Sequence, residues 1–277
     1  MTNVLHVGAA EGEIEFYSNL GVEKLVYAEP DRNCLAQLIG NFNRLNKSRS
    51  FMQTDIIPKA CSSISGENLN FFANGRGQSS LEKPESRTKQ MVGDNFECYN
   101  VETISLVDLK QSTFKNEIVN YLCIDTQGHE KPIICSCDPE YLNSNFNCID
   151  VELMTDVNQY AIPAGNWKDV VLHLLRSGFE PIIHPHGITE SYIFLNKRLG
   201  TNEYNKQVMN IRDALMTEFF NHSEVKLRGW EVSSLCAIGD HYFLPFTNIG
   251  GAIHASQLQP FREKFVSMYL SKCLLEE

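Results

Sequence analysis

Val4-Leu-His-Val-Gly-Ala-Ala-Glu-Gly12, near the start of the chain, joins a short apolar run to a loop bounded by two glycines. Apolar residues at positions 14, 17 and 20 then recur at helical spacing, and Lys24-Leu-Val-Tyr-Ala-Glu29 has the composition of a second buried strand that ends in an acid. Pro30 and Asp31 open a second helix, whose apolar side chains again recur at helical spacing. The order strand, loop, helix, strand, helix predicts an α/β fold.

The same alternation continues along the chain. Further strands are expected over residues 51–60, 69–74, 119–125, 146–152, 180–184 and 191–196, and a helix over 167–175. Strands that alternate with helices form a mainly parallel sheet covered by helices on both faces. We therefore expect a Rossmann-like domain over residues 1–199. Its polar, glycine-containing stretch 75–93 is a candidate active-site loop, because long irregular segments in compact domains usually have a function.

Residues 200–277 differ in pattern from the rest of the chain. Their apolar residues fall at helical spacing in two segments, around 208–219 and 261–268, and no chemical motif is present. This predicts a helical C-terminal extension. The first expected strand begins at residue 4, so no preceding segment is expected to cover a cofactor, and we hypothesise that the extension acts as a lid or as a homo-oligomer contact.

Composition excludes several classes of protein. The 277 residues include 24 Lys and Arg against 34 Asp and Glu, a net charge of −10, which argues against a nucleic-acid-binding surface. No window approaches the roughly 18 consecutive apolar residues of a membrane span, and the N-terminus lacks the basic region of a signal peptide. The nine cysteines follow no framework spacing. We therefore expect reduced thiols in a cytoplasmic protein that acts away from membranes.

The loop after the first strand is the first candidate binding site, since ligands of open α/β sheets bind beyond the carboxyl ends of the strands. Gly8 and Gly12 permit close backbone approach, and free N–H groups at the helix start favour an anionic group. Glu29 follows at about the offset at which an acid binds ribose hydroxyls. The dinucleotide fingerprint needs a middle glycine that this loop lacks, and Glu11 would repel a phosphate. A nucleoside with a sulfonium cation, S-adenosylmethionine, is therefore favoured over NAD.

Several ordered motifs resemble one family. They are Val4–Gly12, Tyr27-Ala-Glu-Pro-Asp31, Ala60-Cys-Ser62, Gly77-Gln-Ser-Ser-Leu81, Val101–Leu109 and Ile124-Asp-Thr-Gln-Gly-His-Glu130. Together they resemble the FkbM family of class I S-adenosylmethionine-dependent methyltransferases over roughly residues 4–196. The family is associated with O-methylation of hydroxyls, often on sugars or sugar-bearing molecules. The resemblance thus implies a small, polyhydroxylated acceptor.

The resemblance also implies roles for individual residues. The methionine end of the cofactor would lie on Gly8, Ala9 and Gly12, the ribose on Glu29, and the adenine near Ala60 and Cys61. Asp125 matches the motif that lies near the reacting methyl group. Gln127 and His129 stand where family members often carry an acid and a small residue, so the general base is left open between His129, Asp125 and Glu152.

Each candidate also has a plain structural explanation. Asp125 could cap the following helix, His129 could be an ordinary solvated histidine, and Glu152 could pair with a basic residue. The substrate-binding candidates are Gln78, Ser79, Ser80 and His129, of which the first three could be turn residues only. Cys61 is better explained as a packing residue than as a nucleophile.

A metal site is not assigned. The pairs His184/His186 and Cys135/Cys137 lack matching partners at zinc spacing, although Asp125 and Glu152 could hold a divalent ion that lowers the pKa of a sugar hydroxyl. Two rival functions remain at this point. One is an NAD-linked or other nucleotide-binding Rossmann enzyme, and the other is a non-catalytic binding protein on a methyltransferase fold.

Overall fold

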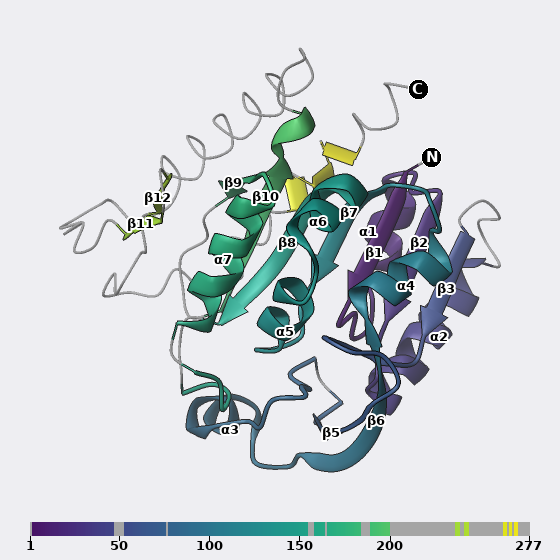
Figure 1. Cartoon of the computed structure of the whole chain (residues 1–277). Coiled ribbons are helices and arrows are strands. Elements are labelled where there is room, and N and C mark those ends of the chain that lie inside the picture. Colours follow the sequence, from purple (N-terminus) through teal and green to yellow (C-terminus); the bar gives the residue numbers. More distant parts are fainter. Residues whose placement is uncertain are drawn as a thin grey trace, which may run out of the picture.

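A computed structural model describes residues 2–46, 53–75, 77–154, 158–163, 165–183, 189–199, 236–238, 241–243, 263–264, 266–267 and 269–270. A seven-stranded sheet with the order β3-β2-β1-β7-β8-β10-β9 forms its centre, with helices on either side (Figure 1). The strands are β1 (Asn3–Val7), β2 (Lys24–Ala28), β3 (Gln53–Ile57), β7 (Val119–Ile124), β8 (Phe146–Met154), β9 (Phe179–Ile183) and β10 (Thr189–Asn196). The expected α/β fold with a mainly parallel sheet is confirmed.

The strand order reverses beside β1. From β1 the chain runs outward through β2 to β3, and it returns to pair β7 with the other edge of β1. The pairs among β3, β2, β1, β7 and β8 are parallel, whereas β10 pairs antiparallel with both β8 and β9. The carboxyl ends of β1 and β7 therefore form the crevice at which open α/β sheets bind their ligands.

Two apolar clusters fill the two faces of the sheet. Leu5, Val7, Leu122 and Ile124 face the first cluster, whereas their neighbours Val4, Tyr121 and Cys123 face the second, as the two-residue period of a strand requires. The helices that cover the first face are α4 (Leu106–Thr113), α5 (Glu130–Cys135), α6 (Pro139–Asn145) and α7 (Asn166–Arg176). Those on the second face are α1 (Ile14–Asn19) and α2 (Arg32–Asn46).

Side-chain caps fix the start of several helices. Ser105 Oγ accepts the Asp108 N–H at 3.1 Å in α4, and Asp138 Oδ1 accepts the Glu140 N–H at 2.8 Å in α6. Asp31 Oδ1 accepts the Asn33 N–H at 2.9 Å, so α2 begins where the sequence predicts. Each such cap satisfies a backbone donor that has no partner within the helix.

A smaller sheet lies at the carboxyl end of the large one (Figure 1). It contains β4 (Ala60–Ser62), β6 (Glu97–Ser105) and β5 (Asn68–Ala73), in the order β4-β6-β5. The prediction of one strand over residues 51–60 is wrong in this respect. The chain leaves the large sheet at Ile57, and after Pro58, which has no N–H for a strand ladder, it enters the small sheet at Ala60.

The predicted irregular stretch 75–93 also contains a helix, α3 (Ser86–Val92). Only Thr88 of this helix is buried. A short helix with so small a buried face leaves no apolar period in the sequence, which is why the pattern did not predict it.

Most of the predicted C-terminal extension lies outside the described residues. The short strands β11 (Cys236–Ile238) and β12 (His241–Phe243) pair with each other, and η1 (Lys197–Leu199) follows β10. Val266, Tyr269 and Leu270 are buried in the second cluster, and the Tyr269 hydroxyl donates to the Asn120 carbonyl at 3.2 Å. The boundary at residue 199 stays a prediction, as does the lid or oligomer role. Within the described ranges, no helix is long and apolar enough to cross a membrane.

Candidate active site

The loop after β1 is shaped by packing at its glycines. Gly8 has φ +75°, and a Cβ added there would lie 1.7 Å from the carbonyl oxygen of Asp125. Gly12 has φ +71°, and its added Cβ would lie 2.3 Å from Cδ1 of Leu38 in α2. Glycine is therefore required at position 8 by the backbone that it faces, and it is favoured at position 12 by the positive φ and the Leu38 side chain. Ala9, between them, is buried in the second apolar cluster.

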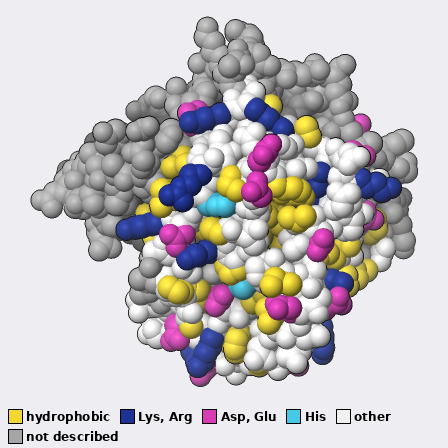
Figure 2. Space-filling model, in the orientation of Figure 1, with side chains coloured by type: hydrophobic (Ala, Val, Ile, Leu, Met, Phe, Trp, Pro, Cys, Tyr) yellow, Lys and Arg dark blue, Asp and Glu magenta, His cyan; other side chains and the backbone are white. Residues whose placement is uncertain are grey.

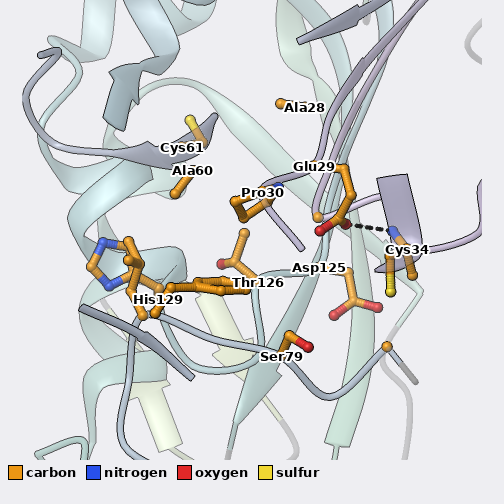
Figure 3. Close-up of a pocket in the computed structure, with 15 residues that line it drawn as sticks. Ala28, Glu29, Pro30, Cys34, Ala60, Cys61, Ser79, Asp125, Thr126 and His129 are labelled. Atoms are coloured by element: carbon orange, nitrogen blue, oxygen red, sulfur yellow. Dashed lines mark hydrogen bonds between the residues drawn. The ribbon is translucent and has the colours of Figure 1, made fainter. Parts of the chain in front are cut away.

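A pocket opens at the carboxyl ends of β1, β2 and β7, and its empty space, including the open mouth, is about 460 Å³. Glu29 and Asp125 lie toward one side of it, and Cys61 and His129 toward the other (Figure 3). The lining residues are Gly8, Ala10, Ala28, Glu29, Pro30, Cys34, Ala60, Cys61, Phe71, Gly77, Ser79, Leu81, Asp125, Thr126 and His129. The pocket thus occupies the crevice that the strand order predicts.

Glu29 is the acid at the end of β2, and both of its carboxylate oxygens are hydrogen-bonded. Oε2 accepts the Ala10 N–H and Oε1 accepts the Asp31 N–H, each at 2.7 Å. The residue is 4% exposed, and burial raises the pKa of its carboxyl to about 8, although the two N–H donors act in the opposite direction. A buried acid is thereby held against the glycine loop.

Asp31 ties the start of α2 to the loop that follows β5. Its Oδ2 accepts the Gly75 N–H at 3.1 Å and the Ser79 hydroxyl at 2.5 Å. Of the three substrate-binding candidates in that loop, only Ser79 lines the pocket. The buried Ser80 hydroxyl bonds to the Gln127 carbonyl at 2.9 Å, and the Gln78 carbonyl accepts the Tyr160 hydroxyl at 2.9 Å. The latter two contacts hold the loop in position.

His129 lies between two polar partners at the edge of the pocket. Its Nδ1 is 2.8 Å from Oε1 of Glu82, and its Nε2 is 3.0 Å from Oγ of Ser62. A carboxylate only accepts, so in the neutral imidazole Nδ1 carries the proton and Nε2 presents a lone pair to the hydroxyl. His129 is 7% exposed, which excludes the explanation as a solvated histidine.

Asp125 and Glu152 are brought together by Gln127. The Gln127 Nε2 donates to Asp125 Oδ1 at 2.6 Å and to Glu152 Oε2 at 2.5 Å. Helix α5 begins at Glu130 with His129 at the N-cap, so Asp125 does not cap it. In the part of the chain that the structure describes, no three His, Cys, Asp or Glu side chains converge as a metal site. His184 and His186 lie outside the described residues.

The Glu130 side chain accepts hydrogen bonds from the loop between β7 and α5. Its Oε1 accepts the Thr126 N–H and hydroxyl, both at 3.0 Å, and the Gly128 N–H at 3.1 Å. Burial raises the pKa of this carboxyl to about 7. These bonds fix the turn that presents Asp125, Thr126 and His129 to the pocket.

Ala60 and Cys61 reach the pocket from the small sheet. Cys61 is buried in the first apolar cluster, and burial raises the pKa of its thiol. A protonated thiol among apolar side chains is a poor nucleophile, which favours its explanation as a packing residue.

The residues that line the pocket lie within a stretch of the chain that matches a known protein family. A family model, the methyltransferase FkbM domain, matches residues 6–181, which contain all the candidate site residues named above. The chain belongs to the FkbM methyltransferase family. Among curated protein sequences none matches.

The solved structures that match are distant from this FkbM protein. An FkbM methyltransferase from Methylobacillus flagellatus KT has 12% identity and a TM-score of 0.44 over 70% of this chain and 43% of its own. The chain thus spans less than half the length of that protein. A candidate methylase from Haemophilus influenzae has 15% identity and a TM-score of 0.36 over 71% of this chain and 87% of its own. A candidate RNA methyltransferase from Pyrococcus horikoshii has 11% identity and a TM-score of 0.32 over 70% and 72%.

The candidate residues of this FkbM domain fall into three groups. Seven line the pocket: Gly8, Glu29, Ala60, Cys61, Ser79, Asp125 and His129. Glu152, Gln78 and Ser80 contact residues of the pocket region through hydrogen bonds, and Ala9 and Gly12 pack behind the loop. Their individual roles in binding and catalysis stay predictions.

The partners that orient these residues in the FkbM domain are far away in the sequence and are not predicted by it. Ser62 and Glu82 contact His129 across 67 and 47 positions of chain. Tyr160 reaches Gln127 Oε1 at 3.2 Å across 33 positions. No local spacing signals such contacts, because the small sheet and the loop before α7 bring them together.

Proposed function

We propose that this protein is an S-adenosylmethionine-dependent O-methyltransferase that acts on a hydroxyl of a small, polyhydroxylated or sugar-bearing acceptor. Family membership supports methyl transfer, and the pocket at the reversal of strand order offers a site for it. The cofactor and the class of acceptor are the proposal.

The observation that carries the choice of cofactor is the charge of the pocket. Its lining contains Asp125, a second acid, Glu29, whose raised pKa keeps it largely neutral near pH 7, and no lysine or arginine among the described residues. The Ala10 N–H, which a dinucleotide phosphate would need, already donates to Glu29. A cationic sulfonium nucleoside fits this lining better than the pyrophosphate of NAD. The NAD-linked alternative is therefore disfavoured on a second, independent ground.

The residues at the pocket suit the parts of that cofactor. Glu29, at the end of β2, would accept ribose hydroxyls with the lone pairs that its two N–H bonds leave. Ala60, Cys61 and Phe71 supply an apolar wall for a base. When bound, S-adenosylmethionine supplies a sulfonium methyl group to an acceptor oxygen and leaves as S-adenosylhomocysteine.

His129 is our choice of general base. Glu82 holds the proton on Nδ1, so the Nε2 lone pair is free to take a proton from a hydroxyl. Ser62 is the donor to that lone pair in this structure, and we propose that an acceptor hydroxyl replaces it. Glu82 would then stabilise the imidazolium that forms. Such a base contributes about two to four powers of ten in rate.

A small molecule suits the surface better than a nucleic acid. On the face shown in Figure 2, basic and acidic side chains are interspersed across the described residues, without a continuous basic stripe. Binding to phosphates needs such a stripe. Together with the net charge of −10, this favours an uncharged acceptor that enters the pocket itself.

Thermal unfolding with candidate ligands tests the cofactor. S-adenosylmethionine or S-adenosylhomocysteine at about 100 times Kd should stabilise the protein by about 2.7 kcal/mol, or roughly 5 to 10 °C. Glu29→Gln should lose most of this shift, because an amide cannot accept both N–H bonds and a ribose hydroxyl in the same way. Glu11→Gln is the matched control, since it removes an exposed acid from the same loop.

The outcomes separate the rival functions. A shift with NAD but not with the sulfur nucleosides would overturn the choice of cofactor. A shift with the sulfur nucleosides, without release of S-adenosylhomocysteine in the presence of a panel of glycosides and polyols, would favour the non-catalytic alternative. Release with one member of the panel would identify the acceptor class.

A further inference from the structure

We propose that the Gln127 amide takes the place of a divalent cation between Asp125 and Glu152, and that it positions this carboxylate pair at the pocket without a metal. Asp125 ends β7 and lines the pocket, whereas Glu152 lies on the neighbouring β8. Gln127 Nε2 lies 2.6 Å from one carboxylate and 2.5 Å from the other. One nitrogen therefore joins two acids that would otherwise repel each other.

The orientation of the amide follows from its neighbours. Carboxylates only accept hydrogen bonds, so the NH₂ group must face Asp125 and Glu152, and its two protons serve one acid each. The carbonyl end, Oε1, then lies 3.2 Å from the Tyr160 hydroxyl, whose single proton is shared between Oε1 and the Gln78 carbonyl at 2.9 Å. The reverse orientation would place an oxygen against both carboxylates. Both ends of the Gln127 amide therefore have hydrogen-bond partners, which fixes its orientation.

The backbone holds Gln127 in this place. The residue has φ +55°, a left-handed conformation that costs a side chain about 1–2 kcal/mol. The Ser80 hydroxyl bonds to its carbonyl at 2.9 Å, and the Gly128 N–H bonds to Glu130 at 3.1 Å. Gln127 is 8% exposed, so the amide works in a largely buried setting. A conformation this constrained points to a fixed role for the side chain.

The position of Nε2 is one that a hard cation could occupy. Oxygen ligands lie at about 2.0–2.1 Å from Mg²⁺ and about 2.3–2.6 Å from Ca²⁺, and carboxylates are their preferred donors. The amide nitrogen lies at nearly the same distance from both carboxylates and fills the space between them. A cation and the Gln127 amide therefore compete for the same point. The role of the pair in methyl transfer rests on the proposed function, whereas this competition does not.

Binding of Mn²⁺ alone, followed by electron paramagnetic resonance and calorimetry on metal-stripped full-length protein, tests the inference. Wild type should show no saturable Mn²⁺ site at Asp125 with a Kd below about 1 mM. Gln127→Glu, which places a third carboxylate at this point, should gain a site at least about tenfold tighter. Gln127→Ala, which vacates the point, should gain a weaker one. Adding Glu152→Gln to Gln127→Glu should remove the gain.

Two results would overturn the inference. One is a Mn²⁺ site in wild type that disappears in Asp125→Asn, and this arm needs no variant of Gln127 to fold. The other is a folded Gln127→Glu or Gln127→Ala protein that binds Mn²⁺ no better than wild type. Binding of S-adenosylhomocysteine to wild type is measured in the same samples. Its absence would count against the proposed cofactor and leave the conclusion about Gln127 unaffected.

Discussion

Replacing Gly8 by alanine should destabilise the protein far more than a positive φ angle alone would. The added Cβ would lie 1.7 Å from the Asp125 carbonyl oxygen and 2.6 Å from its carbon. Both atoms belong to the backbone of β7's carboxyl end, so no side-chain rotation relieves the clash. The two strand ends must move apart by at least about 1.3 Å to reach the 3.0 Å that Cβ contacts respect.

The cost has two parts. An alanine at φ +75° loses roughly 1–2 kcal/mol relative to glycine. Separation of the strand ends also weakens the Gly8 N–H bond to Ala28 and the Asp125 N–H bond to Val7, both 2.9 Å long and each worth about 0.5–1.5 kcal/mol. The free energy of unfolding should therefore fall by about 2–5 kcal/mol, a large part of the roughly 5–15 kcal/mol of a typical domain.

Urea unfolding followed by circular dichroism measures this loss, with Gly66→Ala as the matched control. Gly66 has φ +81°, but its added Cβ would meet no atom within 4 Å, so only the conformational cost of roughly 1–2 kcal/mol applies. If Gly8→Ala proved no less stable than Gly66→Ala, the argument that Gly8 is required by packing against Asp125 would be refuted.

Three further predictions concern charge, packing and catalysis. Burial raises the pKa of Glu29 to about 8, so the folded state keeps a proton that the unfolded state loses above about pH 4.5. The free energy of unfolding should fall between these pH values by up to about 1.4 kcal/mol per unit, and Glu29→Gln should remove that part of the slope in urea titrations across this range. Tyr269→Ala should cost about 3–5 kcal/mol in urea unfolding because its ring is buried, and a loss below about 1 kcal/mol would contradict its place in the core. His129→Ala should lower turnover of a hydroxyl acceptor about 10²- to 10⁴-fold with the Kd of S-adenosylhomocysteine nearly unchanged, and an unaltered rate would exclude His129 as the base.

The sequence predicts the central strands well because their burial is simple. Every residue of β1 and β2 is buried, as expected for parallel strands covered on both faces, and most residues of each strand are apolar. Glu29 could be assigned from the same local unit, since a strand, a loop and a helix fix its distance from the glycine loop. These features depend on neighbours within about 30 positions.

The sequence does not predict that β3 and β4 are separate strands in different sheets. Residues 53–62 are a plausible single strand by composition, yet the chain changes sheets around Pro58. A proline interrupts a strand ladder, but the sequence alone does not say that a second sheet receives the next residues.

The site shows the same limit in its polar contacts. His129 could be named as a candidate from its place after β7, but its orientation depends on Ser62 and Glu82, which lie 67 and 47 positions earlier. Gln127 has no role that the sequence predicts, and its contact with Glu152 spans 25 positions. Such partners are set by tertiary packing, which a spacing rule does not contain.

The central place of β1 has a consequence for synthesis on the ribosome. β1 is made first, yet one of its two neighbours is β7, and Asn3 contacts Asn120 across 117 positions. At about 5–20 residues per second, the backbone N–H and C=O groups on that edge of β1 stay without their partner strand for roughly 6 to 23 s. The Tyr269 contact with Asn120 then spans a further 149 positions. The chain therefore cannot complete its core from the N-terminus onward, because the second edge of β1 stays unpaired until residues 119–124 have been made.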